Sequence, residues 1–236
     1  RRYSYKEVYR GTGKIANTLK NLAVGQGDTV GIYMPMSPQI IFSLLACWKV
    51  GAIPIPIFSG FGPAPVAARL RNAEAKVLIT ADGSLRRGKV FPIKENADEA
   101  VDMVPSVKDV VVLKRAGIDV PWHATRDIWM HQLVQGLPED CPTEEMDSED
   151  YAMIIYTSGT TGTPKGAVHT HGGCLAQICK ELGYYFDVKQ EDIFFWLTDI
   201  GWMMGPWMII GVMNFGGTFV IFEGVSDYPE PDRLCE

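Results

Sequence analysis

The sequence lacks the cysteine and histidine patterns of disulfide-rich and zinc-binding proteins. Its five cysteines are odd in number and contain no C-x-x-C pair. Such cysteines are typical of reduced thiols, so we expect a cytoplasmic protein without disulfides. It has only four histidines, and no ligand-spaced Cys, Asp or Glu lies near His169 and His171, so we predict no metal-ligating residues.

An excess of basic residues is also missing. With 22 Lys and Arg against 28 Asp and Glu, the net charge is −6, whereas nucleic-acid binding requires a basic surface. We therefore expect no nucleic-acid partner. A chain with a net negative charge can bind an anion only where several basic residues lie close together. Local clusters of Lys and Arg are therefore more informative than the net charge.

No uninterrupted apolar run long enough for a membrane helix is present. Residues 200–222 carry no charge, and roughly 20 apolar residues span a bilayer. Yet Pro206, Asn214 and the Gly216–Gly217 pair interrupt this stretch. We predict a buried helix, a turn and a buried strand over 218–222, and no membrane partner.

The remaining pattern alternates helix and strand and predicts an α/β fold with mainly parallel sheets flanked by helices. We expect helices over 4–25, 37–51, 64–72, 91–104 and 171–185. Strands are expected over 28–34, 53–58, 76–80, 109–114, 151–156, 166–169 and 192–196. The two prolines of 53–58 indicate that this strand lies at a sheet edge or is short. Residues 115–150 are expected to form a connector holding one short helix. The chain opens without methionine and stops within a helical pattern, so we expect a piece of a longer protein.

Residues 157–166 combine hydroxyls, glycines and one lysine directly after an apolar strand. Glycines let backbone N–H groups turn inward around an anion, and hydroxyls and a lysine add donors and charge. This predicts a phosphate-binding loop. Its candidate residues are Thr157, Ser158, Gly159, Thr160, Thr161, Gly162 and Lys165.

The loop departs from the P-loop, G-x-x-x-x-G-K-[ST]. Pro164 occupies the second glycine position and Gly166 replaces the Mg²⁺-binding hydroxyl. Pro164 also disfavours a helix beginning beneath the phosphate. A P-loop phosphotransferase remains an alternative that requires a helix beginning at Lys165. The motif G-x-S-x-G is absent around Ser158, which excludes a serine nucleophile of that kind.

The string YTSGTTGTPKG, residues 156–166, resembles the signature of the adenylate-forming superfamily. The resemblance extends over nearly the whole chain and is nearest to the AMP-forming acetyl-CoA synthetases. It implies that the chain is part of the large N-terminal AMP-binding domain. It implies a first α/β lobe over 1–114, the connector, and a phosphate-loop and acyl-pocket segment over 151–236, without the C-terminal lid domain.

Further roles follow from the resemblance. Lys165 would act with the phosphate loop on ATP and is the candidate catalytic residue. Arg86 and Lys89 match positions that contact coenzyme A in that family, and they lie in the basic segment 79–94, which also holds Arg87. Asp227 stands where many relatives have an asparagine that lies near coenzyme A.

The resemblance also implies an acyl pocket. Asp199, Gly201 and Trp202 match a D-x-G-W element of the family, and the pocket would be bordered by Trp202, Met203 and Met204. The methionine pair replaces a small apolar residue and a threonine, so strict acetate specificity is not implied.

The resemblance therefore implies activation of a short-chain carboxylic acid by ATP with Mg²⁺, followed by transfer to coenzyme A. A medium-chain acyl-CoA synthetase or another acyl-adenylate former is an alternative, and so is a non-catalytic ligand-binding domain of the same fold. Residues for adenine and Mg²⁺ would lie beyond Glu236, so we expect this piece alone to be inactive. The preferred acid and the oligomeric state remain open.

Overall fold

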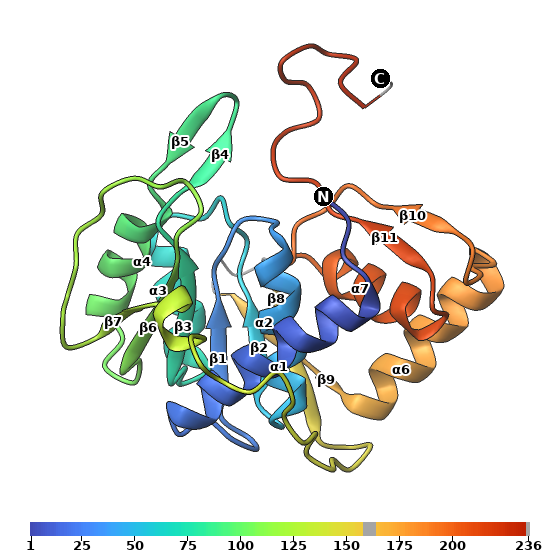
Figure 1. Ribbon diagram of the computed structural model, residues 1–236, viewed down its shortest axis with the longest axis horizontal. Coiled ribbons are helices and arrows are strands. Elements are labelled where there is room, and N and C mark those ends of the chain that lie inside the picture. The colour runs from blue at the N-terminus through green and yellow to red at the C-terminus, as the bar shows by residue number, and fades with distance from the viewer. Residues whose placement is uncertain (158–163, 235–236) are drawn as a thin grey trace.

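The computed structural model describes residues 1–157 and 164–234. Figure 1 shows a parallel sheet covered by helices on both faces and a second group of helices and strands beside it. The sheet has five strands in the order β2-β1-β3-β6-β7, and every neighbouring pair is parallel. The predicted α/β class and mainly parallel sheet are thus confirmed. These strands are β1 (Thr29–Ile32), β2 (Ile53–Pro56), β3 (Val77–Ala81), β6 (Asp109–Leu113) and β7 (Asp127–Trp129).

Helices on the two faces of this sheet enclose two apolar cores. One core lies under α1 (Tyr5–Asn21) and α2 (Pro38–Lys49), and the other under α3 (Pro63–Asn72) and α4 (Ile93–Asp102). Local sequence sets where these helices begin. Ser4 and Glu7 form the capping box of α1, and Pro38 is the first residue of α2, where its missing N–H costs nothing.

The second half of the chain builds a third core. It contains the antiparallel pair β8 (Tyr151–Thr157) and β9 (Lys165–Thr170), and the parallel pair β10 (Ile193–Phe195) and β11 (Thr218–Val220). Its helices are α6 (His171–Lys180), which continues as a π-helical turn (Glu181–Tyr185), and α7 (Met204–Asn214). The indole Nε1 of Trp48 on α2 donates to the carbonyl of Ala152, at 2.6 Å, and so joins this part to the first.

Residues 200–222 form the largely buried helix α7 and the strand β11, as the interruptions in the apolar stretch predict. The expected burial of the strand is wrong, because Thr218 and Val220 are exposed and Phe219 is only partly buried. Among the described residues there is no helix whose length and apolar content would let it cross a membrane.

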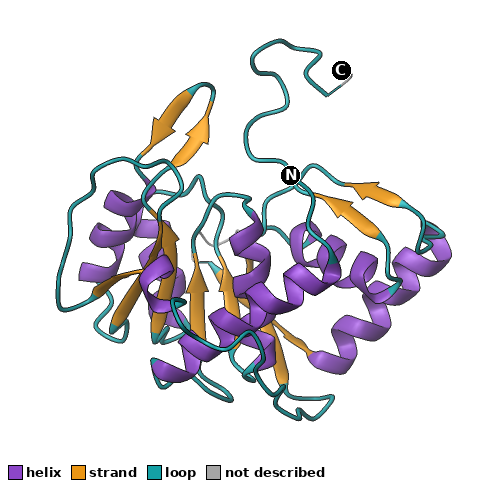
Figure 2. Ribbon diagram, viewed as in Figure 1, coloured by secondary structure: helices purple, strands orange, loops and turns teal. Residues whose placement is uncertain are grey.

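Three parts of the chain differ from the expectations. Between the strand expected to end at residue 80 and the helix expected from residue 91, where we expected no regular element, the basic segment forms a hairpin of β4 (Ser84–Arg86) and β5 (Lys89–Phe91). Because Phe91 pairs in β5 and Pro92 caps the helix, α4 begins at Ile93 instead of Phe91. The connector contains, besides the short helix α5 (Met130–Leu133), the strand β7 that completes the five-stranded sheet (Figure 2). The proline-containing β2 is an edge strand of that sheet, as predicted.

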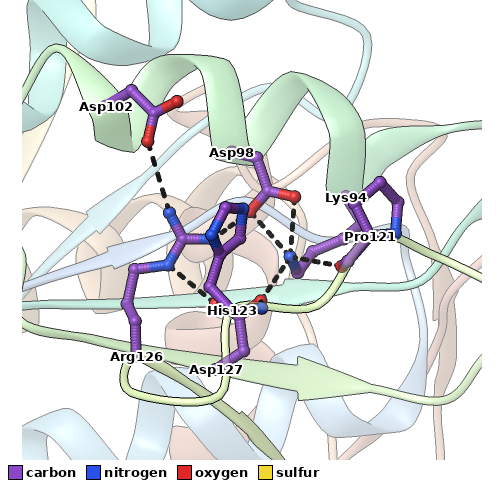
Figure 3. A network of polar contacts seen from close by, with 7 residues as sticks. All are labelled: Lys94, Asp98, Asp102, Pro121, His123, Arg126 and Asp127. Atoms are coloured by element: carbon purple, nitrogen blue, oxygen red, sulfur yellow. Dashed lines mark hydrogen bonds and ion pairs between the residues drawn. The ribbon is translucent and has the colours of Figure 1, made fainter.

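A buried ionic network fastens α4 to the segment before β7 (Figure 3). The ammonium of Lys94 has no exposed surface and lies 2.6 Å from Asp98 Oδ1 and 2.7 Å from Asp127 Oδ2. It also donates to the carbonyl of Pro121, and Arg126 pairs with both aspartates. Burial opposes ionisation of Asp127, but hydrogen bonds from Arg126, Lys94 and the His123 N–H together lower its pKa. Each of these charges has a partner of opposite sign, so the loss of any one of them would leave a buried charge unpaired.

Candidate functional site

The carboxyl ends of the strands converge on one open cavity. It has a volume of about 550 Å³ and is lined by residues that follow five different strands. Loops beyond the ends of parallel strands are where open α/β sheets bind ligands. The lining residues include Met36 after β1, Ser59 after β2, Arg86 after β3, Asp199 and Trp202 after β10, and Asp227 after β11.

Arg86 enters this cavity from the last position of β4. Its backbone pairs with Lys89 across the hairpin, and its guanidinium would lie 3.0 Å from a Cβ placed on Gly60. In Figure 1 the hairpin projects beyond the carboxyl ends of the strands, the end of the sheet to which the arrowheads of β1 and β2 point. Arg86 thus brings positive charge to the cavity wall. Lys89 is exposed on β5 and is not among the residues that line the cavity.

Asp199 holds two of the lining loops together. Its Oδ2 accepts from the Ser59 hydroxyl at 2.6 Å, and its Oδ1 accepts from the Gly201 N–H at 2.8 Å. Burial raises the pKa of Asp199, although the hydrogen bonds from Ser59 and Gly201 and the charge of Arg86 act in the opposite direction. We therefore assign Asp199 a positioning role for the loop that carries Trp202.

Gly201 shows why this loop requires a glycine. A Cβ at this position would lie 2.1 Å from the backbone nitrogen of Phe58 and 2.4 Å from its Cα. The loops after β2 and β10 are therefore in direct backbone contact. Next to this contact, the ring of Trp202 lies 5.5 Å from that of Phe58, centroid to centroid, and remains 47% exposed in the cavity.

The two methionines after Trp202 lie elsewhere. Met203 and Met204 begin α7 and pack against the third core, which contains Met153 and Trp207. Neither lines the cavity in the part of the chain that the structure describes. Of the three residues predicted to border an acyl group, the structure brings only Trp202 to the cavity with Arg86.

The phosphate loop connects the antiparallel strands β8 and β9. Thr157 and Lys165 are cross-strand neighbours, and both are exposed. The predicted residues Ser158, Gly159, Thr160, Thr161 and Gly162 lie outside the described residues. Lys165 begins a strand, so the helix that a P-loop places directly after its lysine is absent here, and the P-loop alternative is excluded.

Asp227 lines the cavity and is engaged by a residue to which we assigned no role. The guanidinium of Arg87 lies 2.9 Å from Asp227 Oδ1 and 2.7 Å from Oδ2. This pairing lowers the pKa of Asp227. The basic cluster pointed to Arg87, but nothing in the sequence indicated its partner, 140 residues away.

The sequence also held no sign of Ser59, which lines the cavity, or of Tyr33, which is buried in the core beside it. The Tyr33 hydroxyl donates to the carbonyl of Phe61 at 2.5 Å, and burial raises the pKa of Tyr33 to about 12. Both residues anchor the loop after β2. Single hydroxyls of this kind carry no sequence signal, because their partners are fixed only by the fold.

The described residues contain no cluster of three or more His, Cys, Asp or Glu placed to hold a metal ion. Burial lowers the pKa of both His169 and His171. The described residues alone therefore form no metal site, and we derive no step through a metal.

Comparisons with known proteins agree with this arrangement. A family model described as AMP-binding enzyme matches residues 1–236. The acetyl-coenzyme A synthetase of Methanothrix thermoacetophila is 46% identical over 231 residues, which cover 98% of this chain and 35% of that protein. That of Pseudoalteromonas atlantica is 45% identical over 234 residues, 98% of this chain and 36% of that protein.

A solved structure has the same fold. The acetoacetyl-CoA synthetase from Streptomyces lividans superposes with a TM-score of 0.88 at 30% sequence identity. The match covers 95% of this chain and 34% of that one. The chain thus spans roughly a third of the length of the relatives that it matches.

Proposed function

The chain belongs to the AMP-binding enzyme family, and we propose on that basis that it forms part of an AMP-forming acyl-CoA synthetase for a short-chain carboxylic acid. The observation that carries this proposal is the cavity in which Arg86 and Trp202 lie together. It offers a cation and an aromatic surface at the carboxyl ends of the strands. The names of the relatives support acetate or a similar acid as the substrate.

The reaction would take place in two steps. A carboxylate oxygen attacks the α-phosphorus of ATP, and the bond to pyrophosphate breaks, which gives acyl-AMP. The thiol of coenzyme A then loses its proton to solvent, its sulfur attacks the acyl carbon, and AMP leaves with the electron pair of the broken bond. Neither step requires a covalent enzyme intermediate, so the chain's contribution is positioning and charge stabilisation.

Each group of site residues has a role in this scheme. Lys165 and Thr157, with the hydroxyls and glycines of 158–162, would hold the phosphates of ATP and stabilise the departing pyrophosphate. Trp202 would border the acyl group. Met203 and Met204 would lie behind Trp202. Their flexible side chains would either fill the space next to the acyl group or change rotamer to admit longer acyl chains.

Coenzyme A would approach along the hairpin and the segment after β11. Arg86 can bind a phosphate through a two-pronged guanidinium, whereas Lys89 supplies a point charge and Asp227 lies at the same mouth. Mg²⁺ would reach the site bound to ATP. The division into a lobe over 1–114, a connector that contributes β7, and a segment over 151–236 is part of this proposal.

The test is ATP–pyrophosphate exchange by the whole protein with acids from acetate to octanoate. We expect exchange with short acids and its loss in Lys165→Met. Preference for acids beyond four carbons would identify the alternative, a medium-chain enzyme with a yielding methionine wall. Binding of an acyl-AMP analogue without any turnover would contradict the proposal and identify a non-catalytic domain.

Arg86→Ala separates the two half-reactions. It should leave exchange intact and raise the KM for coenzyme A by about 10- to 100-fold, since a hydrogen bond to a charged group contributes about 1.5–3 kcal/mol. Equal losses in both half-reactions would contradict the coenzyme A role. The 236-residue chain alone is expected to show no exchange, because it spans only about a third of its relatives.

A further inference from the structure

Arg87 occupies a backbone position that arginine rarely adopts. It has φ of 49° and is followed by Gly88 with φ of 68°, and together they form the two-residue turn between β4 and β5. Asn, Asp and Gly are the usual residues in such turns, because they tolerate positive φ. Turn formation alone therefore does not explain an arginine here. An unfavourable backbone conformation of this kind points to a role for the side chain.

The Arg87 side chain is held by a carboxylate, both of whose oxygens lie close to the same guanidinium nitrogen. Both Asp227 oxygens lie within 2.9 Å of Arg87 Nη2, and the two side chains are 56% and 51% exposed. The pair thus lies at the cavity mouth, where solvent and solutes reach it. A phosphate, like a carboxylate, presents several oxygens that can accept hydrogen bonds from a guanidinium.

Further contacts hold the segment around Asp227, residues 223–228, against the hairpin. Glu223 accepts from the Leu85 N–H at 3.3 Å and from Arg115 Nε at 2.9 Å. A Cβ on Gly88 would lie 2.2 Å from the Tyr228 hydroxyl, so this ring lies directly on the turn. Residues 223–228 therefore run along the hairpin and place Asp227 on Arg87.

We propose that Asp227 occupies, on Arg87, the place of a phosphate group of an incoming phosphorylated ligand. Arg87 is then a third phosphate-binding cation of the hairpin, next to Arg86 and Lys89, and it becomes available when Asp227 leaves. The exchange breaks one ion pair and forms another, and no covalent bond changes. The identity of the ligand as coenzyme A rests on the proposed function, whereas the competition between Asp227 and phosphate does not.

The first experiment titrates the whole protein with adenosine 3′,5′-bisphosphate at low ionic strength. Asp227→Asn should tighten binding by about two- to fivefold, the range expected when an exposed ion pair no longer competes. In an Arg87→Asn background the same substitution should have no effect. Asparagine is chosen at position 87 because it tolerates positive φ and so preserves the turn.

The second experiment measures hydrogen exchange of the backbone amides in residues 223–228 without ligand. Arg87→Asn and Asp227→Asn should each accelerate it. Asp187→Asn is the matched control: it breaks another exposed pair, with Lys189 at 2.5 Å, at a position whose φ is also positive, and should leave this segment unchanged.

Three results would overturn the inference. In the first, Asp227→Asn changes the affinity for adenosine 3′,5′-bisphosphate equally in the wild-type and Arg87→Asn backgrounds. In the second, Asp227→Asn does not increase that affinity. In the third, no variant binds the probe. Failure of the whole protein to catalyse exchange would count against the proposed function alone. A gain in affinity in Asp227→Asn that depends on Arg87 would still support the competition.

Discussion

The hydroxyl of Ser59 donates to the carboxylate of Asp199 across 2.6 Å, although 140 residues separate the two along the chain. This bond joins the loop after β2 to the loop after β10. Both loops line the cavity, and Asp199 is itself 8% exposed. The positions of the two loops, and with them the shape of the cavity, therefore depend on the buried carboxylate of Asp199 and its hydrogen bonds to Ser59 and Gly201.

Ser59→Ala removes the hydroxyl and leaves the Asp199 carboxylate with one partner fewer. We expect the free energy of unfolding to fall by about 1.5–3 kcal/mol, the usual contribution of a hydrogen bond to a charged group. Urea denaturation at neutral pH measures this loss. Ser84→Ala is the control, because Ser84 lines the same cavity without a recorded side-chain hydrogen bond among the described residues, and it should have little effect. Equal losses in both variants would contradict the role of Ser59.

Asp199→Asn tests the raised pKa of Asp199. In the folded state the carboxyl binds its proton more tightly than in the unfolded chain, where its ordinary pKa is 3.8. The wild-type protein therefore loses stability as the pH rises from 3.8 through the higher folded pKa. Asparagine does not ionise, so the stability of the variant relative to wild type should increase over this window and then remain constant. Urea midpoints between pH 3.5 and 7 measure the difference, and a pH-independent difference would contradict the assignment.

Gly201→Ala tests the backbone contact between the two loops. Its Cβ would lie 2.1 Å from Phe58 N, so a backbone must move. We expect a loss of about 1–3 kcal/mol or more in unfolding free energy and a change in Trp202 fluorescence. Gly25→Ala is the control, because a Cβ there meets nothing within 4 Å. A stable Gly201→Ala protein with unchanged fluorescence would contradict the close approach.

The family resemblance, together with the expected strands, accounts for what the sequence could predict of the site. The resemblance pointed to Arg86 and Trp202, which follow the strands expected over 76–80 and 192–196. Open α/β sheets bind ligands beyond the carboxyl ends of their strands, and the structure brings both residues to one cavity there. The positions of Met203 and Met204 were not predictable in this way. Consecutive residues at a helix start face different directions, and the packing of α7 against the third core decides which one reaches a cavity.

The missed elements share a physical cause. Strands β4, β5 and β7 have three residues each, too few for an alternating pattern, and the turn of the hairpin lacks the usual Asn-Gly signal. Lys94 and Asp98 have the i,i+4 spacing of an exposed helical ion pair. They are buried because residues 121–127 cover them, a contact between distant parts of the chain that local sequence does not encode.

Because Lys94 is buried, its ion pairs should contribute more to stability than an exposed lysine–carboxylate pair with a similar N···O distance. Lys94→Met leaves Asp98 and Asp127 short of one cation in a site closed to water, and we expect unfolding free energy to fall by about 3–5 kcal/mol. Lys20→Met breaks the pair with Glu144 at 2.8 Å, where both side chains are more than one-third exposed, and should cost less than about 1 kcal/mol. Because Asp127 has a lowered pKa, its contribution is present above its ordinary pKa of 3.8 and is lost as the pH falls through the folded value. The gap between the two variants in urea denaturation should therefore narrow in acid. Equal costs at neutral pH would show that the network adds no more than a surface pair.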